Sequence, residues 1–313
     1  MIACFDIGGS AIKAAYAAAP DRLTIGARVP TPLDSFDGFA DAIAGLCRAH
    51  PGATTAISIS IAGVVDPRNG RLTCANIPCI NGRTIAADLS GRLGLPVFIA
   101  NDADCFALAE ALLGAGAGHD NVFGVILGTG VGGALVIDGR IVTGAGGFAG
   151  EWGHGQALAT EVGEPPRRIG HFACGCGQKG CVDTLGGARG LERLHGALGG
   201  APADSHAILA AWRAGDGEAA RTIDAYLELV APPLALTLNI TGASIVPVGG
   251  GLANAWDLME ALDRAVRARV LRQVDHPLLV RAALSTEPGL TGAALLGFQE
   301  LAARAAALPG AQA

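Results

Sequence analysis

The sequence lacks an excess of positive charge. It carries 22 Lys and Arg against 28 Asp and Glu, which gives a formal net charge of −6. Without a basic surface, electrostatic attraction to the phosphates of DNA or RNA is weak. We therefore expect no nucleic-acid partner.

The sequence also lacks an apolar leader that ends in a small-residue cleavage site. With eight cysteines, this absence predicts a cytoplasmic protein with reduced thiols rather than disulfides. Residues 229–256 carry no charge and are numerous enough to span a membrane. Because Pro232, Pro233, Gly242 and Pro247 would break any helix through this segment, we expect it to be buried core, with no membrane association.

With 313 residues, half of them hydrophobic, the chain is long enough for two domains. We expect a small α/β domain of residues 1–117 plus 291–313 and a larger α/β domain of residues 118–290. An arrangement of strand, glycine turn and strand opens the chain and recurs at 121–139, which suggests two related halves. Further strands are predicted at 56–63, 96–102, near 244–249 and near 278–284, and helices at 35–50, 103–114 and 291–307. Beyond the cysteines of residues 174–181, the chain is predicted to be mainly helical up to about 241, with Pro232 and Pro233 splitting or kinking the longest helix.

Two phosphate-binding motifs are excluded. The sequence has no G-x-x-x-x-G-K-[ST]. "LGTGVGG" matches G-x-G-x-x-G formally, but a strand-like segment rather than a helix follows it, so it is not the dinucleotide fingerprint. Three glycine turns remain at strand ends, "DIGGS" (6–10), "LGTGVGG" (127–133) and "VGGG" (248–251). Each alone is typical of a simple hairpin, but together they indicate a nucleotide site, because their backbone amides can converge on phosphate oxygens.

Four motifs in order carry a resemblance to a known family: "FDIGGSAIK", "ANDADCFALAEA", "ILGTGVGGALVIDGRIVTGAGGFAGEWGH" and "CGCGQKGC". The chain resembles the ROK family of repressors and sugar kinases over nearly its whole length. The resemblance implies the α/β, two-domain actin-like (ribonuclease H-like) fold with an interdomain cleft, a homodimer, and phosphoryl transfer from ATP with Mg²⁺. The loop between "GEWGH" and the cysteines resembles that of the members that phosphorylate the 6-hydroxyl of N-acetyl-D-glucosamine.

Other functions stay open. The substrate could be glucose or N-acetylmannosamine, and the donor could be polyphosphate instead of ATP. A sugar-responsive regulator without its DNA-binding domain is less favoured, because the first glycine motif starts at residue 6, and a zinc-containing oxidoreductase is a further alternative.

The family resemblance also implies roles for individual residues. Asp102 is the expected catalytic base that accepts the proton of the sugar hydroxyl; as the first residue of a helix it could otherwise be an N-cap. The residues expected to contact the sugar are Gly63, Asn76, Asn101, Asp102, Glu151, His154 and Asp183. Those expected to bind the nucleotide and its metal are Asp6, Gly8, Gly9, Ser10, Lys13, Gly128, Thr129, Gly130, Gly249, Gly250 and Gly251. Asp183 stands where the family usually has Glu, so its carboxylate reaches one methylene less far.

The stretch "CGCGQKGC" supplies three thiolates, from Cys174, Cys176 and Cys181, and zinc prefers a fourth nitrogen or sulfur ligand. His171 is nearer in the sequence, but His154 corresponds to the zinc ligand of the family, and we expect His154. Four protein ligands leave no open position, so this zinc would be structural. A redox site would need the C-x-x-C spacing, which is absent.

Overall fold

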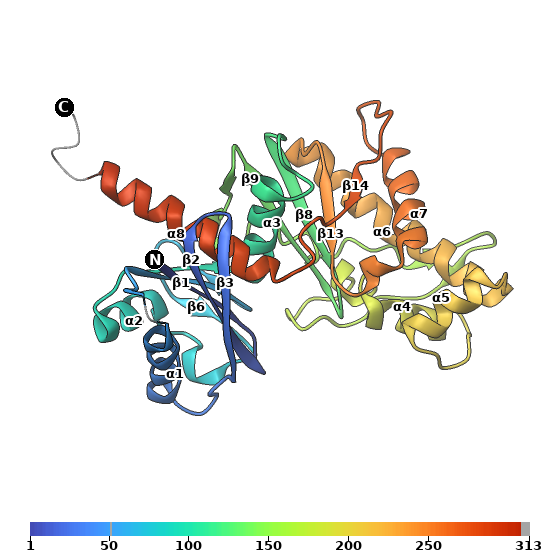
Figure 1. Ribbon diagram of the computed structural model, residues 1–313. Coiled ribbons are helices and arrows are strands. Elements are labelled where there is room, and N and C mark those ends of the chain that lie inside the picture. The colour runs from blue at the N-terminus through green and yellow to red at the C-terminus, as the bar shows by residue number, and fades with distance from the viewer. Residues whose placement is uncertain (51, 308–313) are drawn as a thin grey trace. The chain divides into compact units, whose positions relative to one another are not determined.

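The computed structural model describes residues 1–50 and 52–307 (Figure 1). The chain forms two compact units, and the described residues of the first are 1–50, 52–114, 140–149 and 284–307. The second comprises residues 115–139 and 150–283. These limits lie a few residues from the expected ones, and the segment 140–149 groups with the first unit. Whether each unit folds as a domain stays a prediction.

The sheet of the first unit has the strand order β3-β2-β1-β4-β7. β4 and β7 run parallel to β1, whereas β1, β2 and β3 are successive antiparallel neighbours. Side chains alternate along β1: Phe5 and Ile7 pack with α1 and α2 on one face, and Ile2 and Cys4 pack with α3 and α8 on the other. The bounds are β1 Ile2–Ile7, β2 Ala11–Ala19, β3 Arg22–Pro30, α1 Phe36–Ala49, β4 Ala56–Ile61, β5 Val64–Val65, β6 Leu72–Thr73, α2 Ile85–Leu93, β7 Val97–Asn101, α3 Asp102–Leu113, β10 Arg140–Ile141 and α8 Pro288–Ala306.

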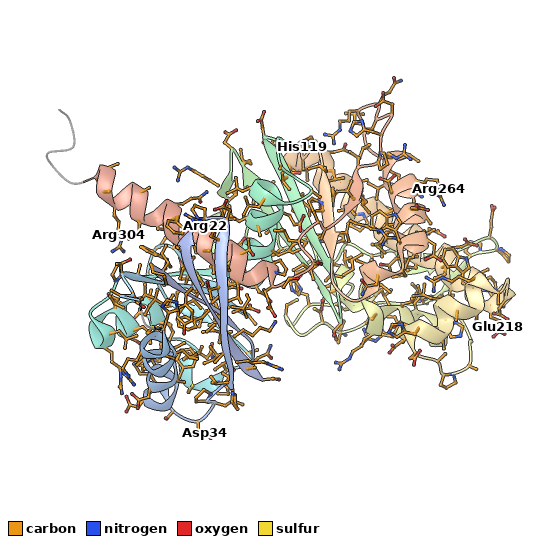
Figure 2. The ribbon with its side chains drawn as sticks, viewed as in Figure 1. Arg22, Asp34, His119, Glu218, Arg264 and Arg304 are labelled. Carbon is orange, nitrogen blue, oxygen red and sulfur yellow. The ribbon has the colours of Figure 1, made fainter. Side chains whose placement is uncertain are left out.

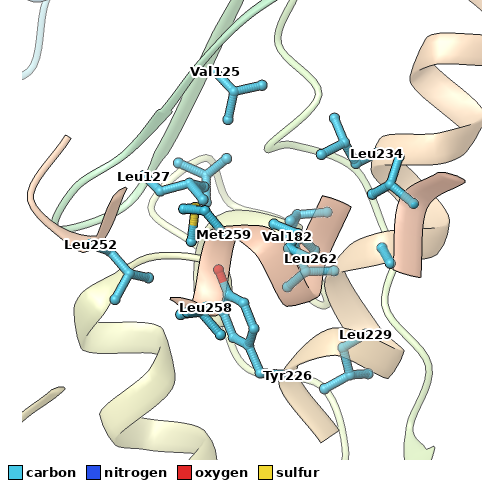
Figure 3. Packing of buried hydrophobic residues seen from close by; sticks show 14 of the residues in the cluster. Val125, Leu127, Val182, Tyr226, Leu229, Leu234, Leu252, Leu258, Met259 and Leu262 are labelled. Atoms are coloured by element: carbon cyan, nitrogen blue, oxygen red, sulfur yellow. The ribbon is translucent and has the colours of Figure 1, made fainter. Parts of the chain in front are cut away.

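The second unit repeats this plan. Within it the strand order is β9-β8-β13-β14, with β9 antiparallel to β8, and β13 and β14 parallel to β8. The order corresponds to β2-β1-β4-β7, which confirms the prediction of two related halves. The core includes Val125, Leu127, Tyr226 and Met259 (Figure 3). The bounds are β8 Asn121–Leu127, β9 Val131–Ile137, β11 Glu161–Val162, β12 Arg167–Arg168, α4 Ala188–Ala197, α5 Ser205–Arg213, α6 Gly217–Thr241, β13 Val246–Gly249, α7 Trp256–Arg267 and β14 Leu279–Arg281.

Of the two outcomes expected at Pro232 and Pro233, a split of the longest helix does not occur. α6 continues through both prolines and ends at Thr241, where Gly242 adopts the left-handed conformation that commonly closes a helix. Each proline removes one backbone hydrogen bond, but Leu229, Leu234 and other residues of this stretch are buried in the core, and this packing offsets the loss. α6 is the one described helix that is long and apolar enough to cross a membrane, and half of its apolar window is buried inside the protein.

Most of the predicted elements are present, but some limits differ. α8 begins at Pro288 rather than at residue 291, because proline fits the first turn of a helix. β3 and α2 were not predicted. Charged side chains such as Arg22, Asp34 and Glu218 are exposed and point away from the cores of their own units (Figure 2).

Candidate functional site

Strand pairing brings Asp6, Lys13 and Ser60 together in the first unit. Asp6 in β1 is directly opposite Lys13 in β2 and Ser60 in β4. The Ser60 hydroxyl donates a hydrogen bond to Asp6 Oδ1 (3.0 Å), and Lys13 Nζ lies 3.6 Å from Asp6 Oδ2. Lys13 also donates to Glu287 (2.7 Å), and this hydrogen bond raises the pKa of Lys13. Glu287 was not identified from the sequence.

The turn that follows β1 holds Gly8, Gly9 and Ser10. The Gly8 amide donates to the Ala11 carbonyl (3.1 Å), which closes the turn, and Ser10 is exposed. Gly9 approaches the backbone of Asn76, because a Cβ on Gly9 would lie 3.0 Å from the Asn76 carbonyl oxygen. Gly9 and Asn76, predicted separately for nucleotide and sugar, are therefore neighbours.

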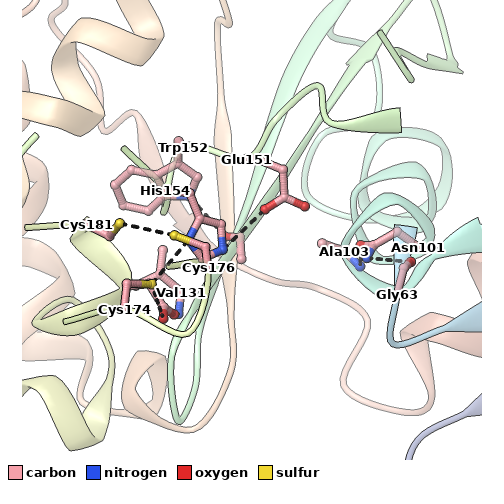
Figure 4. Close-up of polar contacts among 12 residues, drawn as sticks. Gly63, Asn101, Ala103, Val131, Glu151, Trp152, His154, Cys174, Cys176 and Cys181 are labelled. Carbon is pink, nitrogen blue, oxygen red and sulfur yellow. Dashed lines mark hydrogen bonds and ion pairs between the residues drawn. The ribbon is translucent and has the colours of Figure 1, made fainter. Parts of the chain in front are cut away.

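The end of β7 and the start of α3 hold Asn101 and Asp102. Asn101 is the N-cap: its Oδ1 accepts from the Ala103 amide (2.7 Å), and its Nδ2 donates to the carbonyl of Gly63 (3.1 Å) (Figure 4). Asn101 and Gly63, both predicted sugar contacts, are thus joined directly. Asp102 Oδ1 also lies 2.9 Å from the Ala103 amide, and Asp102 is exposed.

Two glycine turns of the second unit line one cavity of about 520 Å³. Gly128 and Thr129 contribute from the turn after β8, and Gly251 from the turn after β13. Gly250 has φ +95°, and a Cβ there would lie 2.4 Å from the Leu127 carbonyl oxygen, so the two turns approach closely. The other lining residues were not predicted: Ala188, Ser205, His206, Leu209, Arg213, Leu252, Asn254 and Ala255. They lie on helices and loops whose sequence carries no phosphate motif.

The four predicted metal ligands lie close together in the second unit. The ligand atoms of His154, Cys174, Cys176 and Cys181 all lie within 4.8 Å of one another. Cys174 Sγ is 3.6 Å from His154 Nδ1, and Cys176 Sγ is 3.6 Å from Cys181 Sγ (Figure 4). His171 lies outside this group, and its Nε2 is 2.8 Å from the Leu158 carbonyl oxygen.

The loop around the cysteines is a tight turn. The Cys174 amide donates to the Gln178 carbonyl (2.9 Å), and the Gly177 amide donates to the Cys174 carbonyl (3.0 Å). The backbone amide of Gln178 lowers the pKa of the exposed Cys176 thiol to about 7, whereas burial raises the pKa of Cys174 to about 12. The thiols of Cys174 and Cys176 therefore differ in pKa, because one is partly buried and the other is exposed and accepts a backbone hydrogen bond.

Glu151 extends this group. Its Oε2 lies 3.7 Å from His154 Nε2, the ring nitrogen that does not face Cys174 (Figure 4). Burial raises the pKa of Glu151; Asp183 adds to the rise and His154 opposes it. Between Glu151 and His154, Trp152 is buried and donates from Nε1 to the Gly132 carbonyl in β9 (3.0 Å), which anchors the loop.

Asp183 contacts both the cysteine group and a glycine turn. Its Oδ1 accepts from the Val131 amide (2.8 Å), and its Oδ2 lies 3.7 Å from Cys174 Sγ. A Cβ on Gly130 would lie 2.3 Å from Asp183 Oδ1, so a larger residue at this position would force the carboxylate to shift. The sequence did not indicate this link between Asp183 and the turn after β8.

A second cavity, of about 390 Å³, lies in the first unit along the edge strand β7. Its lining includes Asn101, Asp104, Arg140 and Glu300. Asn101 is the one predicted site residue among those that line it. This cavity is lined by none of the glycine turns or other residues predicted to bind the nucleotide.

Comparison with known proteins assigns the chain to a family. The model of the ROK family matches residues 2–300. The chain is 36% identical to an N-acetylgalactosamine kinase of Shewanella sp. strain ANA-3, over 93% of this chain and 95% of that protein. It is also 36% identical to an N-acetyl-D-glucosamine kinase of Escherichia fergusonii, over 95% of this chain and 99% of that protein.

A solved structure agrees with these relatives. The ROK family glucokinase of Streptomyces griseus, crystallised with glucose and AMPPNP, is 27% identical, with a TM-score of 0.72 over 95% of this chain and 99% of that one. The chain therefore belongs to the ROK family. Its fold is the mixed α/β, two-domain actin-like fold of the ROK sugar kinases, as predicted from the sequence.

Proposed function

We propose that this protein is an ATP-dependent kinase that phosphorylates the 6-hydroxyl of N-acetyl-D-glucosamine. The observation that carries the proposal is the similarity, over nearly the whole of both chains, to kinases of N-acetylated hexosamines. The products are N-acetylglucosamine 6-phosphate and ADP.

The 520 Å³ cavity supports a nucleotide donor. Polyphosphate would need only backbone amides and cations, but here the glycine turns open onto a pocket that also has the apolar side chains of Leu209 and Leu252. A pocket of this size, part polar and part apolar, suits a nucleoside. We propose that Gly128, Thr129 and Gly130, with Gly249, Gly250 and Gly251, hold the ATP.

The first unit supplies the groups for phosphoryl transfer. We infer that Asp102 accepts the proton of the sugar 6-hydroxyl as the hydroxyl oxygen bonds to the γ-phosphorus, while the bond from that phosphorus to the bridging oxygen breaks and ADP leaves. Because Asn101 already caps α3, the Asp102 carboxylate is not needed as the N-cap. Mg²⁺ bound near Asp6 would neutralise charge on the phosphates, and Gly8, Gly9, Ser10 and Lys13 would lie near them.

The sugar contacts are proposed from both units. Gly63 and Asn101 are hydrogen-bonded to each other, and Asn76 adjoins Gly9. Glu151 and the Nε2 atom of His154 are the contacts proposed from the second unit, with Asp183. Each offers a hydrogen-bonding atom to a sugar hydroxyl.

The group of three cysteines and His154 fits zinc. Tetrahedral zinc with Zn–S bonds of about 2.3 Å and a Zn–N bond of about 2.0 Å places two sulfur atoms about 3.8 Å apart, and a sulfur and a nitrogen about 3.6 Å apart. The separations of 3.6 Å between Cys176 Sγ and Cys181 Sγ and between Cys174 Sγ and His154 Nδ1 are close to these values. We propose that these four residues bind one structural zinc ion, and that His154 rather than His171 completes the site. Zinc held there by Nδ1 would leave Nε2 of His154 for the sugar.

A coupled assay of ADP release over a panel of sugars tests the function. We expect the highest kcat/KM with N-acetyl-D-glucosamine and the same preference when polyphosphate is absent. Because one relative is an N-acetylgalactosamine kinase at the same identity, N-acetylgalactosamine is the second candidate, followed by N-acetylmannosamine and glucose. Higher kcat/KM with another sugar would reassign the substrate, and no ADP release with any of them would refute the proposal.

Two further properties belong to the proposal. We infer a homodimer, as the family resemblance implies, and a cytoplasmic location, as expected from the sequence. Light scattering of the purified protein, and fractionation of the cells that make it, check these two statements. A monomer at all concentrations would contradict the first.

A further inference from the structure

Glu287 has an unusual backbone conformation. Its φ is 48° and its ψ is 54°, in the left-handed region that non-glycine residues rarely adopt. Among the described non-glycine residues, only Asp138 shares a positive φ, and Asp tolerates this region far better than Glu does. Pro288 follows Glu287, and a residue before proline is normally pushed toward the extended region. The conformation is therefore costly, and strain of this kind often marks a functional position.

The Glu287 carboxylate does not cap the helix that it precedes. Glu287 is the N-cap residue of α8, where a carboxylate would be favourable near the free amides, yet its side chain makes no capping hydrogen bond. It accepts instead from Lys13 Nζ at 2.7 Å. The strained backbone thus directs the carboxylate toward Lys13.

Lys13 is shared unequally between two carboxylates. Its Nζ is hydrogen-bonded to Glu287 at 2.7 Å but lies 3.6 Å from Asp6 Oδ2, beyond hydrogen-bond distance. Asp6 is fixed independently, by the Ser60 hydroxyl and by the first turn of α8, where a Cβ on Gly289 would lie 2.9 Å from Asp6 Oδ1. Asp6 therefore keeps its place without a hydrogen bond from Lys13.

The charges of Asp6, Glu287 and Lys13 indicate why Lys13 is held by Glu287 rather than by Asp6. Asp6, Glu287 and Lys13 together carry one net negative charge, whereas Asp6 and Lys13 alone would be neutral. The three side chains are only 26%, 30% and 37% exposed, so their charges are less screened than on an open surface. Without Glu287, the Lys13 ammonium would be free to close onto Asp6 and occupy the oxygen that a divalent cation needs.

We propose that Glu287 is a positioning residue that holds Lys13 away from Asp6, so that the Asp6 carboxylate stays available to the Mg²⁺ of a bound nucleotide. The inference rests on the proposed nucleotide-binding function of Asp6. It predicts that Glu287 sets the Mg²⁺ requirement and leaves the affinity for the sugar unchanged.

The Glu287→Gln variant tests the proposal, because it keeps the length and backbone but loses the charge, so that only a weaker hydrogen bond to a neutral amide oxygen would hold Lys13. We expect the Mg²⁺ concentration that half-activates ADP release to rise at least fivefold, with the KM of the sugar within twofold of wild type. Asp138→Asn is the matched control, since it removes the same charge at the other non-glycine residue with positive φ, and it should leave both values unchanged.

Two more variants separate positioning from folding. Glu287→Gly relieves the strained backbone, so its Tm should equal or exceed that of wild type while the Mg²⁺ requirement still rises. Replacing Lys13 by Gln in the Glu287→Gln background removes the ammonium and should bring the half-activating Mg²⁺ concentration back toward the wild-type value. A Mg²⁺ requirement within twofold of wild type in Glu287→Gln, or no recovery in the double variant, would overturn the proposal.

A binding measurement distinguishes failure of this inference from failure of the proposed function. Titration of Mg²⁺ into the protein with a fluorescent ADP analogue requires neither sugar nor turnover. If wild type releases no ADP with any sugar but Glu287→Gln still shifts this titration fivefold, the kinase proposal fails and the role of Glu287 stands. If wild type phosphorylates sugar and the titration does not shift, only the role of Glu287 fails. Absence of nucleotide binding by wild type would overturn both.

Discussion

Replacement of Asp183 by Ala should disturb both the stability of the protein and its nucleotide kinetics. The variant removes the acceptor of the Val131 amide, at the start of β9 directly after Gly130. Val131 is only 8% exposed, so water replaces the lost acceptor poorly. A hydrogen bond to a charged acceptor is worth about 1.5 to 3 kcal/mol when the donor is left unpaired. We expect a loss of this size in the free energy of unfolding and a Tm lower by a few degrees.

The kinetic effect follows from the position of the turn. Gly128 and Thr129 line the 520 Å³ cavity, and the next two residues of the chain are Gly130, which lies beside the Asp183 carboxylate, and Val131, which donates to it. We therefore expect Asp183→Ala to raise the KM of ATP severalfold, as well as that of the sugar. From the sequence alone, with Asp183 acting only as a sugar contact, the KM of ATP would stay unchanged.

The Asp183→Asn variant separates the structural role of Asp183, its hydrogen bond with Val131, from its proposed role as a sugar contact. The amide oxygen can still accept from Val131 while the charge is lost. Its Tm and KM of ATP should stay near wild type, with the KM of the sugar raised. Asp224→Ala, at an exposed position of α6, is the control for loss of an Asp charge. Calorimetry and initial rates of ADP release measure these quantities. A Tm and KM of ATP in Asp183→Ala equal to those of wild type would refute the structural role.

Three further predictions concern the other parts of the site. Asp102→Asn should lower kcat by about 100-fold or more with little change in either KM, and initial rates that fall less than tenfold would contradict its role as the base. Cys181→Ser should lose about one zinc ion per chain and lower the Tm, whereas His171→Ala should keep the metal; elemental analysis decides, and loss of zinc from the His171 variant would reverse the choice of ligand. Gly250→Ala should lower the Tm and raise the KM of ATP, because its Cβ would meet the Leu127 carbonyl at φ +95°; a Tm equal to that of wild type would show that the turn can shift.

Local sequence signals predicted the parts of the structure that depend on local chemistry. A helix was expected at 35–50, and the side chain of Ser35 accepts from the Gly38 amide at the start of α1. The glycine turns after β1 and β8 were expected because polar or glycine residues interrupt apolar, alternating runs. Both turns are present, and each joins an antiparallel pair of strands.

The missed features depend on contacts between distant residues. Glu287 reaches Lys13 across 274 positions of the sequence, and Asp183 reaches Val131 across 52. Neither residue lies in a motif that indicates its partner. The absence of a split at Pro232 has a related cause, because the local rule that proline breaks a helix was outweighed by burial that only the folded core provides.

The two units share a strand plan but differ at one pair of equivalent positions. In the first unit, the residue before the last of β1 is Asp6, opposite Lys13 on the antiparallel neighbour. In the second unit, the residue before the last of β8 is Ile126, opposite Gly132. A carboxylate and an ammonium at the first position suit a metal and a transferring phosphate. An isoleucine and a glycine provide neither, and the turn after β8 opens instead onto the 520 Å³ cavity. If Asp6 serves the metal and Gly250 serves the nucleotide, Asp6→Asn should raise the Mg²⁺ requirement without weakening ADP binding, and Gly250→Ala should weaken ADP binding without changing the Mg²⁺ requirement.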